Sequence, residues 1–112
     1  MKLNYKQIVT FVNVTNGMVG KKLPLKLSFA LKRNRQLADE VLKPYNEQVK
    51  EIIEAHKDDV EHTTELLDEL LKEEVELDIK TVPVELIEKT EVNGFDVLTL
   101  GELEAVDFMI EA

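Results

Sequence analysis

Apolar residues recur every three or four positions along most of this 112-residue chain, which is the pattern of helices with one buried face. The pattern predicts a first helix over Tyr5–Thr15, opened by a capping box that begins at Asn4 and closed by a left-handed exit at Asn16-Gly17. Because Ile8–Val12 is rich in β-branched residues, a strand at this position is the minority alternative.

The longest stretch with helical spacing runs from Leu23-Pro24 to His56 and predicts one long helix, or two in line. Pro24 suits the first turn, where its missing N–H would have been unpaired anyway. Pro44 lies in the interior, where proline costs about 3 kcal/mol and bends a helix. We therefore expect a kink near Glu40–Pro44.

Asn34 occupies a position of this stripe where an apolar residue would be expected. A single buried Asn can fix the register of a helix. Alternatively, Asn34 lies at the margin of the stripe and is solvated. The second interpretation is favoured because most Asn side chains are exposed.

A second helix is predicted over Val60–Glu74, after a turn around Lys57-Asp58-Asp59 in which either Asp can cap it. One face of this helix carries Val60, Thr64, Leu67 and Leu71, with Leu66 and Leu70 beside it. We expect this helix to fold back on the long one as an antiparallel hairpin.

Strict alternation over Val75–Ile79 predicts a half-buried strand. A single strand needs a partner, and three are open: Phe95–Leu98, the N-terminal segment if that is β, or another molecule.

In the C-terminal third, Thr81-Val82-Pro83 indicates a short helix start and Asn93-Gly94 a turn. A capping box from Thr99 to Glu102 predicts a last helix over Leu100–Glu111. The predicted fold is mostly α, of the α+β class: a long kinked helix in an antiparallel helical hairpin, N- and C-terminal helices, and a small β element. Residues 1–112 are expected to form a single domain.

Charge is divided between the two halves of the chain. Residues 1–50 hold ten Lys/Arg against three acids, and residues 51–112 hold four Lys against twenty Asp/Glu, within a total net charge of −9. Such asymmetry concerns partners or self-association rather than fold. The division falls inside the long helix, so no domain linker coincides with it.

No residue constellation supports catalysis, so we expect a protein that is not an enzyme. The chain has no Cys, which removes disulfides and thiolate chemistry, and Ser28, its only serine, lacks the glycines of a nucleophile elbow. The histidines His56 and His62 could form a metal cluster with nearby acids, but their spacing is poor for helix-borne ligands. We expect neither a metal nor another cofactor.

Sequence segments also bear on location. No apolar run approaches the roughly 20 residues that cross a bilayer, and the first residues lack a signal peptide's apolar stretch. We expect no membrane association and a cytoplasmic location.

Two charged surfaces are candidates for binding. The basic cluster could contact nucleic acid, but it has few aromatic residues to stack on bases, and neutralisation of neighbouring acidic helices is the favoured interpretation. Its members are Lys21, Lys22, Lys26, Lys32, Arg33 and Arg35. The acidic face could occupy a partner's basic groove by imitating a phosphate backbone, although Glu-rich faces commonly serve only solubility. Its candidate contact residues are Asp58, Asp59, Glu61, Glu65, Asp68, Glu69, Glu73 and Glu76.

The order of segments resembles a family of small uncharacterised phage and prophage proteins. The resemblance spans nearly the whole chain and is carried by Leu3–Val9, Lys22–Asn34, Tyr45–Gln48, Glu73–Ile79 and Leu103–Glu111. It implies a viral origin and a bacterial-cell setting, and it brings no catalytic or ligand residues.

From charge and resemblance together we expect a phage accessory protein that binds a bacterial host protein, blocking a defence or nucleic-acid enzyme. The alternative is a virion assembly component that forms a homo-oligomer, basic half to acidic half, with the strand completing a sheet between subunits. Direct nucleic-acid binding is disfavoured.

Overall fold

The computed structural model describes residues 1–91 and 94–111. Its helices are α1 (Tyr5–Asn16), α2 (Leu25–Ala55), α3 (Val60–Lys72), α4 (Val84–Glu88) and α5 (Leu100–Val106), with two 3₁₀ turns at Lys89–Glu91 and Asp107–Met109. Its strands are β1 (Lys2–Asn4), β2 (Glu74–Glu76), β3 (Val82–Pro83) and β4 (Ile110–Glu111). The predicted class, mostly helical with a small β element, is confirmed. No helix in these ranges is long and apolar enough to cross a membrane.

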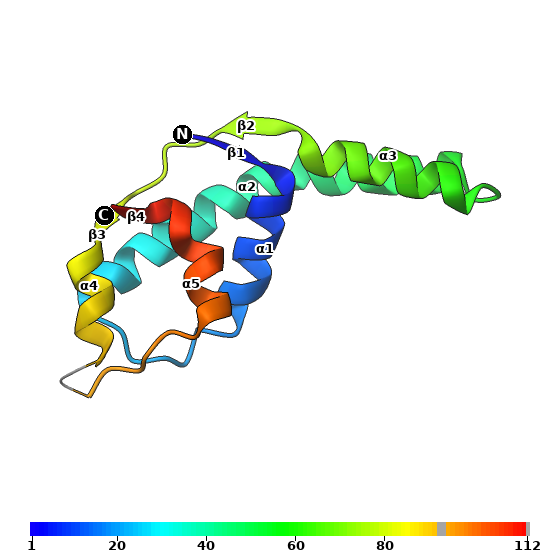
Figure 1. Ribbon diagram of the computed structural model, residues 1–112. Helices are drawn as coiled ribbons and strands as arrows, with labels where there is room; N and C mark the ends of the chain where they lie inside the picture. Colours follow the sequence, from blue (N-terminus) through cyan, green and yellow to red (C-terminus); the bar gives the residue numbers. More distant parts are fainter. Residues whose placement is uncertain (92–93, 112) are drawn as a thin grey trace.

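The long helix α2 runs through Pro44 without a break and organises the molecule. Its first half lies in a compact body with α1, α4 and α5, and its second half extends away beside α3 (Figure 1). Its axis changes direction between these two parts, as expected from the interior proline. The molecule is consequently elongated, with extents of 55 × 23 × 20 Å.

Helix α3 packs antiparallel to the second half of α2, as the sequence predicted (Figure 1). Asp59 is the N-cap, and its side chain accepts a hydrogen bond from the His62 amide at 3.0 Å. The helix therefore begins where the apolar spacing and the capping residue together place its start.

The predicted strand finds its partner in the same chain. β2 pairs antiparallel with β1, Leu3 opposite Val75, so the partner is the N-terminal segment, one of the three that the sequence left open. The β-branched run Ile8–Val12, for which a strand was the alternative, follows β1 and is part of α1. The alternation is confirmed by burial of Leu77 between exposed neighbours, but the ladder is short because Asn4 ends β1 by capping α1.

Three predicted helix ends are wrong. Helix α3 stops at Lys72 rather than Glu74, which lies in β2. Gly17 has a φ of −76°, so α1 exits through a right-handed turn, and this places Met18 in the core. The last helix stops at Val106 rather than Glu111, because the chain turns through Asp107–Met109 into β4. There β4 pairs in parallel with β3, a second small sheet that the sequence pattern did not indicate.

The C-terminal turn chemistry follows the prediction. Thr99 and Glu102 form a capping box at α5, and Pro83 precedes α4 as its N-cap. Gly94 has a φ of 77°, the left-handed conformation expected of a turn glycine, while Asn93 lies outside the described residues.

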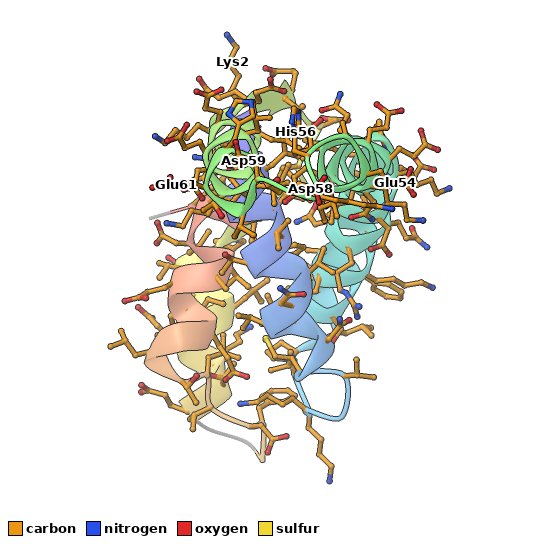
Figure 2. All side chains as sticks on the ribbon, turned by 90° about the vertical axis from the view of Figure 1, so that its right-hand side faces the viewer. Lys2, Glu54, His56, Asp58, Asp59 and Glu61 are labelled. Atoms are coloured by element: carbon orange, nitrogen blue, oxygen red, sulfur yellow. The ribbon has the colours of Figure 1, made fainter. Side chains whose placement is uncertain are left out.

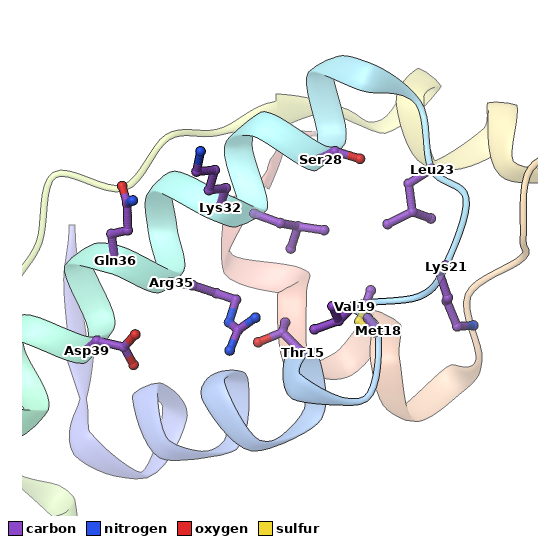
Figure 3. Close-up of a pocket in the computed structure, with 11 residues that line it drawn as sticks. Thr15, Met18, Val19, Lys21, Leu23, Ser28, Lys32, Arg35, Gln36 and Asp39 are labelled. Atoms are coloured by element: carbon purple, nitrogen blue, oxygen red, sulfur yellow. The ribbon is translucent and has the colours of Figure 1, made fainter.

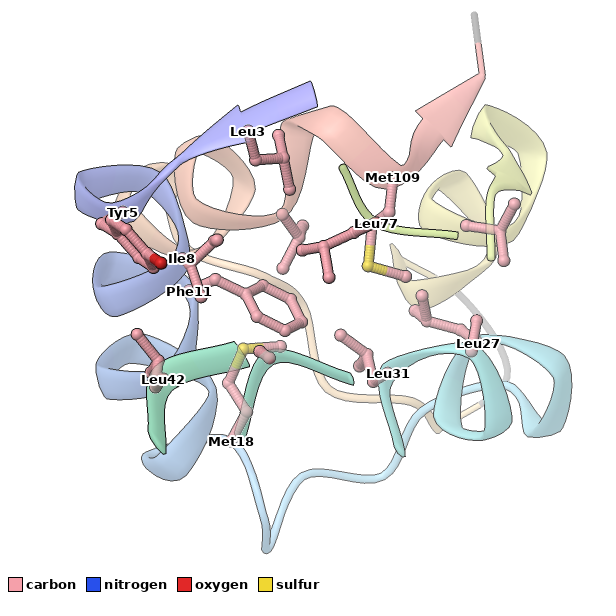
Figure 4. Packing of buried hydrophobic residues seen from close by; sticks show 14 of the residues in the cluster. Leu3, Tyr5, Ile8, Phe11, Met18, Leu27, Leu31, Leu42, Leu77 and Met109 are labelled. Atoms are coloured by element: carbon pink, nitrogen blue, oxygen red, sulfur yellow. The ribbon is translucent and has the colours of Figure 1, made fainter. Parts of the chain in front are cut away.

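The buried apolar residues form one cluster in the body (Figure 4). Phe11 is at its centre and meets Phe108 edge to face, with ring centroids 5.1 Å apart. Tyr5 packs on Tyr45 with centroids 4.9 Å apart, where α2 leaves the body. The cluster packs residues near both ends of the chain against α2. The outer part of the α2–α3 hairpin lies outside the cluster.

Asn34 is fully buried, which overturns its favoured assignment to a solvated margin. Its side chain accepts from the Lys80 amide at 2.8 Å and donates to the Lys80 carbonyl at 2.9 Å. The extended segment after β2 needs partners for its backbone where it crosses α2, and Asn34 supplies them.

Candidate functional site

The outer hairpin, residues 46–72, is here called the arm. It consists of the last turns of α2, the turn and α3, and it projects from the body (Figure 1). Residues 46–72 carry nine Asp/Glu against three Lys. The arm is therefore strongly acidic, while most of the Lys and Arg lie on the body.

All eight predicted acidic contact residues are exposed. Glu61, Glu65 and Asp68 lie at positions i, i+4 and i+7 of α3, and Glu69 adjoins them, so these four share one face of the helix. Asp58 and Asp59 are at the tip, and Glu73 is at the base. The structure thus arranges seven of the eight as a stripe along the arm rather than as a compact patch.

Glu76 differs from the other seven. Its carboxylate lies 2.7 Å from the N-terminal amine of Met1, across the β1–β2 ladder. The hydrogen bond from this amine, together with its charge, lowers the pKa of Glu76. Within residues 1–91 and 94–111, none of the other seven carboxylates is in an ion pair. Glu76 therefore serves the fold, and the stripe remains available to a partner.

The acidic stripe is costly for the helix that carries it. Glu61, Glu65 and Glu69 are spaced four residues apart, and like charges at this spacing destabilise a helix by roughly 0.2–0.5 kcal/mol per pair. A surface that served only solubility could mix charges and avoid that repulsion.

The two histidines meet at the tip of the arm. His56 ends α2 and His62 lies in the first turn of α3, and their ring centroids are 4.7 Å apart in an edge contact. Figure 2 looks along the arm from its tip and shows His56 among acidic side chains. In the described part of the chain, no three His, Cys, Asp or Glu side chains form a group that could hold a metal ion.

The predicted basic cluster divides into paired and unpaired members. Lys21 donates to Glu102 at 2.7 Å and to the Val97 carbonyl at 2.8 Å, which ties the loop after α1 to α5. Burial alone would raise the pKa of Glu102, but hydrogen bonds from Lys21 and Thr99 and the charge of Lys21 outweigh burial, and the pKa is lowered. Arg33 lies 3.8 Å from Asp78, both highly exposed, which contributes little to stability.

A cavity of about 420 Å³ lies between the end of α1, the following loop and α2 (Figure 3). Lys32 and Arg35 line it together with Asp39, over an apolar floor that includes Leu31. The Arg35 guanidinium donates to Asn16, and its Nε is buried without an acceptor in the described residues. Ser28, an early helical residue as predicted, also lines the cavity, but neither histidine does.

A second groove was missed at the level of sequence. It has a volume of about 440 Å³ and lies between the first half of α2 and the β3–α4 segment. Phe29 lines it with 61% of its surface exposed, and Lys26, Arg33 and Lys80 are at its edge. The sequence signal for it was that Phe29 lies off the apolar stripe of α2, with Lys26 three positions before it and Arg33 four positions after it.

Comparison with protein-family models, curated proteins and solved structures finds no match to this chain. The resemblance to small phage proteins stays a prediction.

Proposed function

We propose that this chain is a non-enzymatic phage accessory protein whose acidic arm binds a basic surface of a bacterial protein. The observation that carries the proposal is the stripe of seven exposed carboxylates, four of them on α3, two at the tip of the arm and one at its base, that have no ionic partner in the described ranges. A partner with a groove for nucleic acid has the matching charge, because such grooves are lined with Lys and Arg. A host defence or nucleic-acid enzyme is the class of partner that this chemistry fits.

The shape of the arm supports the same proposal. A 13-residue helix is about 20 Å long, so α3 presents its carboxylates along one side of a projecting hairpin that a groove can receive. The anchored base of the arm, at the Tyr5–Tyr45 contact and the β1–β2 ladder, fixes the direction in which the arm points. Charge complementarity of this kind increases the association rate and selects the partner.

The test is affinity capture from a bacterial lysate with two matched variants. The arm variant carries Glu65→Lys, Asp68→Lys, Glu69→Lys and Glu73→Lys. The control carries Glu85→Lys, Glu88→Lys, Glu104→Lys and Asp107→Lys, four exposed acids of the body, and so changes the net charge by the same amount. Circular dichroism verifies that both variants fold.

We expect the wild-type and control chains to retain the same protein and the arm variant to lose it. Capture of the same protein by the arm variant, or its equal loss from both variants, contradicts the proposal.

A second function is favoured by one observation. The exposed basic side chains around Phe29 and the acidic arm lie toward opposite ends of α2. This arrangement suits self-association in virion assembly, basic end to acidic end, without a shared β-sheet.

A further inference from the structure

We infer that the groove beside Phe29 receives the tip of the arm of a second copy of this chain. The inference rests on the self-association proposed above and names the two surfaces that would meet.

The groove combines an apolar wall with a basic edge. Lys26 and Arg33 lie three residues before and four residues after Phe29, so all three occupy one face of α2. Lys80 approaches from the other side, and Val82 and Leu86 add apolar surface. Two acidic groups lie beside this edge: Asp78, 3.8 Å from Arg33 and highly exposed, and Glu111, whose carboxylate accepts a hydrogen bond from Thr81 of the lining at 2.6 Å. The three cations outnumber them, so the edge keeps a net positive charge.

The tip of the arm has the complementary composition. Val60 is 76% exposed and Ile53 is 45% exposed, so the tip presents two aliphatic side chains to solvent. Glu54, Asp58 and Glu61 are also exposed at this end of the arm (Figure 2). The tip therefore offers exposed aliphatic and acidic side chains, and the groove offers the exposed Phe29 ring and three cations.

The two surfaces cannot meet within one molecule. Phe29 and Ile53 are 24 residues apart on the same helix, which is a separation of about 36 Å. Contact therefore requires another copy, and the interface is heterologous, with the tip of one molecule in the groove of the next. Such contacts produce rings or open chains rather than closed two-fold dimers.

Charge attraction supplies the selectivity of this contact, so it weakens as salt screens the charges. The direct test is sedimentation velocity of the full chain from about 10 to 500 µM, in about 0.05 M and 0.5 M salt. We expect the sedimentation coefficient to rise with concentration at low salt and to fall toward the monomer value at high salt.

Charge-swapped variants identify the surfaces. The groove variant carries Lys26→Glu, Arg33→Glu and Lys80→Glu; the tip variant carries Glu54→Lys, Asp58→Lys and Glu61→Lys and retains the Asp59 cap. We expect each variant alone to stay monomeric at low salt. We expect the mixture of the two to associate, because each groove then faces a tip of opposite charge.

A wild-type chain that stays monomeric overturns both the self-association and the groove assignment. Association of the wild type that persists in the groove variant overturns only the groove. A monomeric chain whose Phe29 ring resonances shift on addition of an oligonucleotide overturns the second copy as occupant and favours nucleic acid.

Discussion

The Asn34 side chain connects α2 to the chain segment that follows β2. It is buried on α2, and its amide makes both hydrogen bonds of the Lys80 backbone, at 2.8 and 2.9 Å. The Asn34 Nδ2 also contacts the Met109 sulfur at 3.5 Å, so α2, the segment after β2 and the C-terminal turn meet there. A polar residue in the apolar stripe therefore fixes where the returning chain crosses α2.

Asn34→Leu is expected to destabilise the protein by roughly 1–3 kcal/mol, because it leaves the Lys80 amide and carbonyl without partners in a partly buried place. Urea unfolding followed by circular dichroism measures the change. Asn46→Leu, at an exposed position of the same helix, is the control and is expected to change stability by less than about 0.5 kcal/mol. Equal effects of the two substitutions would show that the buried amide does not hold the crossing.

The Lys21–Glu102 pair predicts a pH dependence. The pKa of Glu102 is lowered from its ordinary value of 4.5, so its ionised form stabilises the fold above that value, and the stabilisation is lost as pH falls through the folded-state pKa. Glu102→Gln keeps a capping-box acceptor for Thr99 but removes the charge. We expect a loss of about 1–2 kcal/mol at pH 7 that shrinks below pH 4.5. Unfolding curves of both chains between pH 3 and 7 test this, and a loss independent of pH contradicts it.

At the scale of elements, α3 is fixed at both of its ends. The Asp59 cap begins α3, and the Glu73 carbonyl accepts from the Tyr5 amide at 3.1 Å at the other end. Between these points, α3 packs against both α2 and α1, and Leu70 reaches the buried cluster.

Asp59→Ala is expected to lower stability by about 1 kcal/mol and to speed hydrogen exchange of the first amides of α3, because the His62 amide loses its acceptor. Asp58→Ala is the matched control, since Asp58 is exposed and is not the cap. Faster exchange in Asp58→Ala than in Asp59→Ala would show that Asp59 is not the cap.

Apolar periodicity predicted the helices that bury one continuous face. It did not predict a helix end that is determined by a contact with a segment far away in the sequence. The hairpin, the kink region and the caps at Asn4, Asp59 and Thr99 follow from local spacing and side-chain chemistry. The end of α5 does not, because residues after Val106 leave the helix to pair with β3, more than twenty positions earlier. The partner of β2 was equally non-local.

At the scale of the whole molecule, acidic and basic side chains are divided between the arm and the body. The chain places its acidic surplus on a projecting arm and its exposed cations on the body, where Lys21 and Arg33 are partly neutralised. The sequence predicted the acidic residues but not their division into a stripe, a tip and the paired Glu76. It also could not show that Phe29 and Lys80, which are far apart in the chain, border one groove.

The affinity of a captured host protein for the arm tests the central claim most directly. We would measure its dissociation constant, by interferometry at low salt, with the wild-type chain, the arm variant and the body control described above. We expect the arm variant to weaken binding by about tenfold or more and the control by less than about threefold, because the partner's basic surface faces the stripe on α3. Equal dissociation constants for the wild-type chain and the arm variant would contradict the account.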